Sequence, residues 1–548
     1  MGDQDPGESS SSANTTEVEE APSWTRWTAS SYAVVMLLLG IPLWWKTTTV
    51  QRVPLPYYDM LTLHNQFQNE LLIGIPIQFK GFSGVLEGDG YQNVSGYSFK
   101  FTYSVMSATE MDLVYKSTDL YHIDRQMCAM ESQTHNELLK IYYVGRADLL
   151  KEYGQQVILG NCRSIYYIGN KSQIDRKRID KLLLKLIGAT SELQVQDSSN
   201  VKDSLQLPLS AGYDILLSLL VPEPETLEST WEIQRGVKDY LDPMVKKLSR
   251  FAEFTVRSQV LYYVKLNVMP RLNPRTGIYE IPNEQLPLVI NPVESKLSSF
   301  VSQNPALNFL TYTAPCDKYP LQILDDTGSG LVTNAFLVPQ WGGIFIYNAP
   351  CPQGQKNESL ASQESEGNEW NAKHEVSMEQ VMAVVLNQFR SLIGLSDKTK
   401  EDGVLDFRGS TLRDWEVDLL VRRRLRSLLF TSANTLQSLG NLLDQITNIV
   451  VTEKVGWEVE KSVQLLKEAY EYASKGNLAD GQAYALEAFK SSEIAFHHPT
   501  NLAQLYFPDD QKYAIYIPLF LPVGIPVLLS LRIIFAAMKK GSNKVKAD

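Results

Sequence analysis

Hydrophobic and polar residues alternate strictly between residues 97 and 105. The apolar side chains of this stretch are Tyr97, Phe99, Phe101, Tyr103 and Val105. Because successive side chains of a strand point to opposite faces, this alternation predicts a strand with one buried face. Residues 214–222 form instead a continuous apolar run that ends at a proline, which is typical of a strand buried on both faces.

A helical pattern follows this second strand and leads to a third. The helical pattern covers about 230–254, is interrupted or restarts near Pro243, and precedes a strand pattern at 258–268. Strand–helix–strand order predicts a right-handed crossover and at least two parallel strands. Another helix, with a basic outer face, is predicted at 173–188. Residues 55–360 therefore predict an α/β, or mixed α+β, fold around one sheet.

The pattern becomes helical after a polar linker at 353–370. One helical stripe consists of Val381, Val385, Phe389 and Leu392. A second stripe steps by three and four residues, as a coiled-coil seam does, and consists of Leu436, Leu439, Leu443, Ile446 and Val450. A helical hairpin with a turn at Gly476 follows; it resembles one tetratricopeptide unit, but a single copy does not support a repeat array. The last third of the chain is therefore predicted to be a helical bundle.

Two apolar segments are predicted to be transmembrane helices, at 29–46 and 513–538. No small-residue cleavage site follows the first, so we expect an uncleaved anchor rather than a signal peptide. Lysines crowd the end of the chain after the second, which predicts that this end is cytosolic. With two spans, both termini are then cytosolic and the bulk of the chain is luminal. The expected fold class is a membrane-anchored α/β (mixed α+β) luminal domain plus a C-terminal helical bundle.

These expectations divide the chain into six parts. They are a cytosolic disordered tail at 1–28, a transmembrane helix at 29–46, a luminal α/β domain at 47–374, a luminal helical region at 375–512, a transmembrane helix at 513–538 and a basic cytosolic tail at 539–548.

Three further features suit a secretory compartment. Asparagine-linked glycosylation sequons occur at Asn93, Asn170 and Asn357. The four cysteines, an even number, suit an oxidising compartment and allow three pairings, of which we prefer Cys316 with Cys351. Lys544 and Lys546 match a dilysine retrieval signal for the endoplasmic reticulum, or they are an ordinary basic end. Together these features predict a location in the endoplasmic reticulum membrane.

Composition and charge limit the class of partner. Hydrophobic residues make up 44% and charged residues 21% of the chain, as in folded proteins. The formal net charge of −11 argues against nucleic acid, which binds clustered cations. Arg422, Arg423, Arg424 and Arg426 could meet membrane lipid headgroups, or they could form a solvated helix face with ion pairs.

The most suggestive catalytic motif is Asp326-Thr327-Gly328 within "DDTGSG", which spells an aspartic-protease loop. Such a site needs two carboxylates that share a proton, and no second copy of the motif is present. A surface turn is therefore the favoured interpretation. No zinc spacing, nucleophile elbow or phosphate-binding loop occurs, although a Cys–His pair formed in space stays open. We expect no metal and no cofactor.

Six long blocks carry a resemblance to a known family. They are "LGIPLWWKTT" (39–48), "AGYDILLSLLVPEP" (211–224), "QVLYYVKLNVMPRLN" (259–273), "LPLVINPVESKLSS" (286–299), "TNAFLVPQWGGIFIYN" (333–348) and "LYFPDDQKYAIYIPLFLP" (505–522). They closely resemble the phosphatidylinositol-glycan class S (PIG-S) proteins, and the likeness covers nearly the whole chain.

The resemblance implies a non-catalytic subunit of glycosylphosphatidylinositol (GPI) transamidase, which attaches GPI anchors to the C-termini of secretory proteins. The implied partners are PIG-K, the caspase-like catalytic subunit, with PIG-T, PIG-U and the anchor-attachment subunit. The family assigns no catalytic residue to this chain. Two alternatives remain at this stage: a membrane-tethered luminal enzyme, of the aspartic-protease or transferase type, and a stand-alone lectin-like or chaperone-like luminal module.

Overall fold

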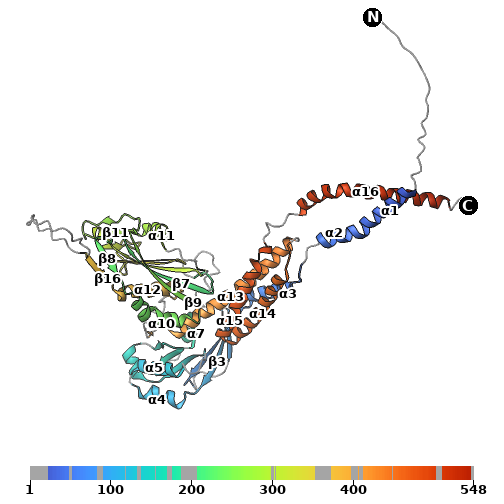
Figure 1. Cartoon of the computed structure of the whole chain (residues 1–548). Coiled ribbons are helices and arrows are strands. Elements are labelled where there is room, and N and C mark those ends of the chain that lie inside the picture. The colour runs from blue at the N-terminus through green and yellow to red at the C-terminus, as the bar shows by residue number, and fades with distance from the viewer. Residues whose placement is uncertain are drawn as a thin grey trace, which may run out of the picture. The chain divides into compact units, whose positions relative to one another are not determined.

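The structure is a computed structural model of the 548-residue chain (Figure 1). It describes residues 23–48, 52–82, 90–94, 96–117, 119–131, 137–154, 156–169, 176–186, 207–297, 302, 304–351, 372–395, 405–406, 412–446, 449–501 and 509–544. The chain divides into two compact units. Unit 1 comprises Met1–Leu55, Leu439–Trp457 and Ile494–Asp548, and unit 2 comprises Pro56–Ser438 and Glu458–Glu493.

The first part of unit 2 is a seven-stranded sheet, which we call the first sheet. Its strands, in spatial order, are β17 (Leu405–Asp406), β5 (Val157–Leu159), β6 (Ser164–Ile168), β4 (Leu139–Val144), β1 (Ile73–Lys80), β3 (Tyr97–Ser104) and β2 (Gly90–Val94). The four strands β6, β4, β1 and β3 run parallel. Strand β2 pairs antiparallel with β3, and β5 pairs antiparallel with β6 but parallel with β17. The strand predicted from alternation is confirmed as β3, because Tyr97, Phe99 and Phe101 are buried.

Helices accompany the first sheet along the chain. They are α3 (Tyr57–Asn69), α4 (Ala108–Lys116), α5 (Leu120–Glu131), α6 (Ala147–Tyr153) and α7 (Arg176–Leu186). Residues of α4, α5 and α6, among them Val114, Ile123 and Leu149, share one buried core with Val144 of β4 and Ile168 of β6. Helix α7 confirms the helix predicted at 173–188.

A five-stranded sheet, the second sheet, forms the next part of unit 2. Its strands, in order, are β14 (Ala335–Val338), β15 (Gly342–Tyr347), β12 (Ala306–Thr313), β7 (Gly212–Val221) and β9 (Glu253–Tyr262). Every residue of β7 is buried, as its continuous apolar run predicts. The helical stretch between β7 and β9 consists of α9 (Ile233–Gly236), a π-helical turn at Val237–Leu241 and α10 (Asp242–Leu248), and the two strands pair in parallel as predicted.

Two small sheets and two helices complete this part. The small sheets pair β10 (Arg271–Leu272), β11 (Tyr279–Ile281) and β13 (Leu321–Ile323), and β8 (Leu227–Thr230) with β16 (Ala372–Glu375). Helix α11 (Leu286–Glu294) packs on one core of the second sheet, and α12 (Met378–Leu392) places Phe389 against Phe254 and Phe309. The expectation of one sheet is thus wrong. Both large sheets contain parallel strands with buried, apolar side chains, so the sequence pattern does not separate one from the other.

The helical region contains α13 (Asp414–Gln445), α14 (Glu453–Lys475) and α15 (Leu478–Phe496). The predicted hairpin is confirmed. Helix α14 ends before Gly476, which has φ +83°, and the hydroxyl of Ser462 in α14 donates to the carbonyl of Ala488 in α15. The turn approaches β1 so closely that a Cβ on Gly74 would lie 2.2 Å from the carbonyl oxygen of Ser474. The seam predicted at 436–450 is buried at its first three leucines, but α13 ends at Gln445.

Unit 1 contains α1 (Ser23–Val35), a π-helical turn at Met36–Gly40, α2 (Ile41–Thr48) and α16 (Asp509–Lys544). It also contains the end of α13, where Arg52 donates to three carbonyls, those of Leu443, Ile446 and Ile449. A cation suits the negative end of a helix dipole. Helices α1 and α16 pack against each other within this unit.

Unit 1 contradicts the two predicted membrane spans. Within the described residues, no helix combines the length and the apolar character that crossing a bilayer requires. The segment 29–46 is split by the π-helical turn, and α16 contains three prolines and has charged residues at both ends. The expected membrane-anchored fold class and the expected multi-pass location with two membrane spans are therefore wrong, and the luminal bulk and cytosolic termini lose the spans from which they were derived. The remaining domain boundaries stay a prediction.

Candidate functional site

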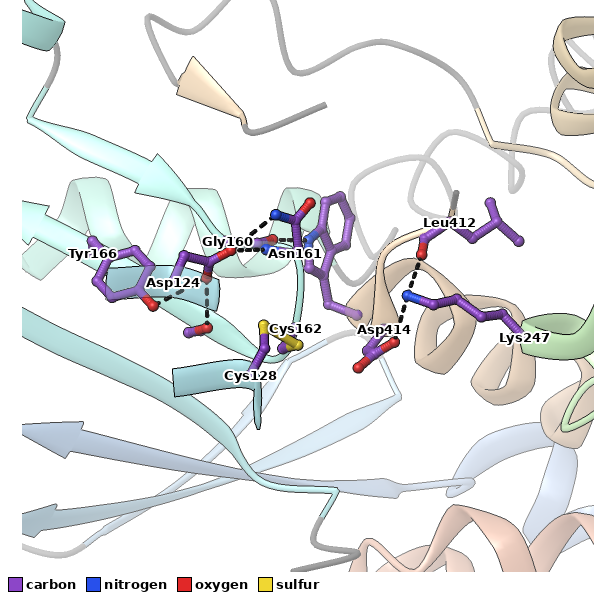
Figure 2. The surroundings of a disulfide bond; sticks show 11 residues. Asp124, Cys128, Gly160, Asn161, Cys162, Tyr166, Lys247, Leu412 and Asp414 are labelled. Atoms are coloured by element: carbon purple, nitrogen blue, oxygen red, sulfur yellow. Dashed lines mark hydrogen bonds and ion pairs between the residues drawn. A yellow bond between two sulfur atoms is a disulfide. The ribbon is translucent and has the colours of Figure 1, made fainter. Parts of the chain in front are cut away.

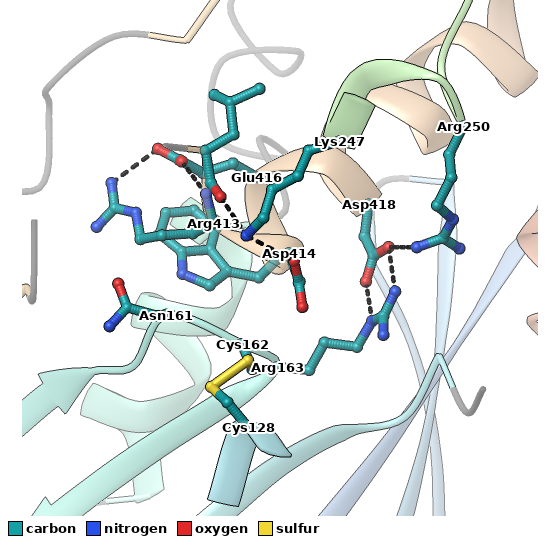
Figure 3. A network of polar contacts seen from close by, with 12 residues as sticks. Cys128, Asn161, Cys162, Arg163, Lys247, Arg250, Arg413, Asp414, Glu416 and Asp418 are labelled. Atoms are coloured by element: carbon teal, nitrogen blue, oxygen red, sulfur yellow. Dashed lines mark hydrogen bonds and ion pairs between the residues drawn. A yellow bond between two sulfur atoms is a disulfide. The ribbon is translucent and has the colours of Figure 1, made fainter. Parts of the chain in front are cut away.

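The densest group of buried charges in unit 2 lies around the first turns of α13 (Figure 3). Asp418 is only 1% exposed. Its carboxylate accepts hydrogen bonds from Arg163 Nε at 2.5 Å and Nη2 at 2.9 Å, and from Arg250 Nη1 at 3.2 Å. Arg163 comes from the first sheet, just before β6, and Arg250 follows α10 beside the second sheet. One carboxylate on α13 therefore joins the two sheet-bearing parts.

Arg250 extends this group to the helical region. Its other nitrogen donates to Glu137, which precedes β4, and the second oxygen of Glu137 accepts from the backbone N–H of Leu478 at 2.6 Å. Leu478 is the first residue of α15, where a carboxylate compensates the positive end of the helix dipole. We call the set Arg163, Asp418, Arg250 and Glu137 the junction network.

A second buried carboxylate, Glu416, ties α12 to α13. It accepts from Arg390 of α12 and from the side chain of Arg413, both at 2.7 Å, and from the backbone N–H of Arg413 at 2.9 Å. Burial alone would raise the pKa of Glu416, but the two arginines outweigh it and lower this pKa to about 2. Glu416 is therefore a charged structural bridge and not a proton donor near neutral pH.

The loop from Gly160 to Arg163 holds the start of α13 (Figure 2). Gly160 accepts from Trp415 Nε1 at 3.3 Å, and the carbonyl of Asn161 accepts from the backbone N–H of Asp414 at 3.1 Å. Arg163, two residues after Asn161, belongs to the junction network. Three of four consecutive residues thus bind α13.

Asp124 of α5 holds this loop from the other side (Figure 2). It is fully buried, and its oxygens accept from the backbone and side chain of Asn161 at 2.9 Å, from Ser164 at 3.3 Å and from Tyr166 at 3.0 Å. One turn further along α5, Cys128 forms a disulfide with Cys162 of the loop. The loop is therefore attached to α5 both covalently and by hydrogen bonds.

The second disulfide joins Cys316 to Cys351, the pairing preferred from the sequence. Both disulfides close loops of similar length, with sequence separations of 34 and 35 residues. The second one lies in the part of unit 2 that carries β12 and β15, away from the Gly160–Arg163 loop in sequence.

In the basic run on α13, Arg423 and Arg426 are half-buried, whereas Arg422 and Arg424 form neither a lipid-facing nor a solvated surface, so both sequence interpretations are wrong for these two residues. Arg422 and Arg424 are 6% and 4% exposed. Burial lowers the pKa of each guanidinium. Arg424 donates to the carbonyls of Ser210 and Phe251 and lies over the Phe251 ring. This arginine thus ties α13 to the second sheet-bearing part.

The "DDTGSG" segment is a surface turn, as favoured from the sequence. Asp325 accepts from the backbone N–H groups of Thr327 and Ser329, and Gly328 has φ +80°. Asp326 is exposed and accepts from Asn283 at 2.5 Å. Hydrogen bonds from Thr327 and Ser329 lower the pKa of Asp325. Among the hydrogen bonds that the structure describes for Asp326, none joins it to a second carboxyl group with which it could share a proton.

The remaining candidate residues are placed as follows. Asn93 is exposed on β2. Asn170, Asn357 and Lys546 lie outside the described residues, and Lys544 is the last residue of α16. Within the ranges that the structure covers, no group of His, Cys, Asp and Glu could hold a metal ion.

The fold and this site define a mixed α/β protein whose central buried charges connect its parts to one another. A profile of the family "Phosphatidylinositol-glycan biosynthesis class S protein" (PIG-S) matches residues 31–541. The chain belongs to this family.

Individual relatives agree with the family assignment. The chain is 36% identical to the "GPI-anchor transamidase component PIGS" of Rattus norvegicus and 34% identical to that of Homo sapiens, each over 94% of this chain and 95% of the relative. It is 24% identical to the "GPI transamidase component PIG-S homolog" of Schizosaccharomyces pombe, over 90% of this chain and 81% of the relative. The similarity thus runs through both units.

Proposed function

We propose that this chain is a non-catalytic component of GPI transamidase, which assembles and braces the complex that attaches GPI anchors to the C-termini of proteins. The names of its relatives as GPI transamidase components support membership of that complex. The bracing role rests on one observation: the buried charges around α13 are engaged in bonds between parts of unit 2.

A subunit with a fixed arrangement of its parts can contribute to a reaction by holding its partners in one orientation. Asp418, Glu137 and Glu416 hold the two sheet-bearing parts and the helices of unit 2 in one arrangement. A partner bound to such a surface keeps a fixed orientation, and fixing reactants in advance removes an entropic cost from a bimolecular step. The proposed partners are PIG-K, which supplies the catalytic cysteine and histidine in this family, together with PIG-T, PIG-U and the anchor-attachment subunit.

The test is an affinity purification of the tagged full-length chain under mild conditions, with quantitative mass spectrometry of the accompanying proteins. We expect a caspase-like Cys/His subunit and the other partners in near-equal amounts. A chain that purifies alone, or with chaperones only, would overturn the proposal.

Two variants separate bracing from catalysis. Asp326→Ala alters the exposed turn, and we expect unchanged partner amounts and unchanged transamidation in cells. Asp418→Asn weakens the junction network, and we expect partner recovery and transamidation to fall together. Lost transamidation with normal partner recovery in Asp326→Ala would instead assign chemistry to this chain.

A further inference from the structure

Strand β2 lies at one edge of the first sheet and carries an exposed asparagine. Among the described strands, β3 is its one neighbour, and the two pair antiparallel from Gly90 with Phe101 to Val94 with Tyr97. Asn93 is opposite Ser98 in this register. Because faces alternate along a strand, Asn93 points to the face opposite the fully buried Tyr97.

The sequence around this residue is Asn93-Val94-Ser95, an acceptor sequon for asparagine-linked glycans. A sequon becomes informative when its amide is accessible and the protein folds where glycans are added. Asn93 is exposed, and the two disulfides indicate folding in an oxidising compartment of the kind where such glycans are attached. The other two predicted sequons do not lie within the described residues.

We propose that Asn93 carries an N-linked glycan that covers the outer edge of the first sheet. The donor is an oligosaccharide linked to a lipid pyrophosphate. The amide nitrogen Nδ2 forms a bond to the anomeric carbon, the bond from that carbon to the pyrophosphate oxygen breaks, and the lipid pyrophosphate leaves with the electron pair. The amide gives up one proton in the exchange, so the product is a neutral glycosylated amide.

A glycan at this place has a physical use. The outer side of an edge strand presents backbone N–H and C=O groups that can pair with a strand of another molecule, and proteins protect such edges. A bulky, hydrated glycan on the strand itself keeps a second strand from approaching. Lys100, exposed on the same face of β3, adds a charge that also disfavours edge pairing.

The experiment uses the full-length chain expressed in a eukaryotic cell, with glycosidase digestion and peptide mass spectrometry. We expect the peptide that contains Asn93 to carry a glycan, and Asn93→Gln and Ser95→Ala each to lose one step of the digestion ladder. Ser95→Thr, which keeps the sequon, should retain that step. Asn170→Gln and Asn357→Gln serve as independent references for the other sequons.

Shielding is measured on the same variants by size-exclusion chromatography of the purified protein. Asn93→Gln and Ser95→Ala should raise the self-associated fraction at least twofold over Ser95→Thr. An unmodified Asn93 peptide in disulfide-bonded protein would overturn the modification site. A glycosylated Asn93 with no change in self-association on its removal would overturn the shielding role.

Discussion

Replacing Asp418 with asparagine tests the junction network directly. The substitution keeps the shape of the side chain and removes its charge. An amide offers one acceptor oxygen in place of two, and its NH2 group then faces the guanidinium of Arg163, which has only 14% of its side chain exposed. The perturbation therefore leaves a buried cation without its anion.

The structure allows the cost to be estimated. Removing one partner of a buried ion pair costs about 3–5 kcal/mol, because the remaining charge stays desolvated. Arg250 adds little to this figure, since its side chain is 38% exposed and water can solvate it. About 3–5 kcal/mol corresponds to an increase in local opening of about 10²- to 10⁴-fold.

Amide hydrogen exchange, read by mass spectrometry on the full-length chain, measures this opening. We expect faster exchange in the Gly160–Arg163 loop and in the first turns of α13. The matched control is Asp112→Asn, which breaks an exposed pair with Lys116 and should cost less than about 0.5 kcal/mol. Exchange that is equally slow in Asp418→Asn and in the control would show that the buried charge pair does not hold the loop to α13.

A double variant sharpens this test. Arg163→Met combined with Asp418→Leu removes both buried charges, and a well-packed apolar pair of similar volume often costs little. We expect the double variant to exchange more slowly than Asp418→Asn alone. Faster exchange in the double variant would mean that hydrogen bonding to other groups, and not the lone buried charge, dominates the loss.

Three more predictions follow from other contacts. Serine at both Cys128 and Cys162 should lower the free energy of unfolding by about 3–4 kcal/mol in urea titrations. Removal of the other disulfide should cost a similar amount but leave amide exchange near α13 slow. Equally faster exchange near α13 in both variants would contradict the proposed attachment of the loop. The low pKa of Glu416 stabilises the fold fully above pH 4.5, and this contribution of about 3 kcal/mol is lost as the pH falls towards about 2; Glu416→Gln should flatten that part of the pH–stability curve, and an unchanged slope would count against it. Gly74→Ala forces a Cβ against a carbonyl oxygen at the α14–α15 turn and should destabilise the chain by about 1–3 kcal/mol with faster exchange in that turn; Gly154→Ala, where φ is +67° and no atom lies within 4 Å, should cost about 1 kcal/mol and leave the turn unchanged.

Local patterns predicted individual elements well. The alternation at 97–105, the apolar run at 214–222 and the stripe that includes Val385 and Phe389 correspond to β3, β7 and α12. In each case the periodicity of the side chains reports directly which face is buried. The turn at Gly476 was also predictable, because glycine favours the left-handed conformation that ends a helix.

Contacts between distant parts of the chain were not predictable in this way. Arg422 and Arg424 look like surface residues because arginine is seldom buried, and nothing nearby in sequence shows that Ser210 and Phe251 will accept from Arg424. Asp418 meets Arg163 across 255 residues. The only sequence signal was the acidic first turns of α13, which is also how many solvated helices begin.

The apolar segments near the termini show a different limit. Hydropathy alone led to two membrane spans, but the first segment divides at Met36–Gly40 into shorter helices, and no described helix meets the requirement for a span. Composition over a window does not reveal where a helix is interrupted. The family assignment does not depend on these spans, because the matched residues extend through both units.

The 255-residue separation between Arg163 and Asp418 also sets an order of events during biosynthesis. At about 5–20 residues per second, the ribosome completes the Gly160–Arg163 loop roughly 13–50 s before Asp418 is made. Cys128 and Cys162, separated by 34 residues, are both made before that interval begins. The disulfide can therefore fix the loop before α13 is made, so that the helix packs against a loop that is already formed. If this oxidation is delayed, α13 is made before the disulfide has fixed the loop, and the nascent chain would need a chaperone for longer.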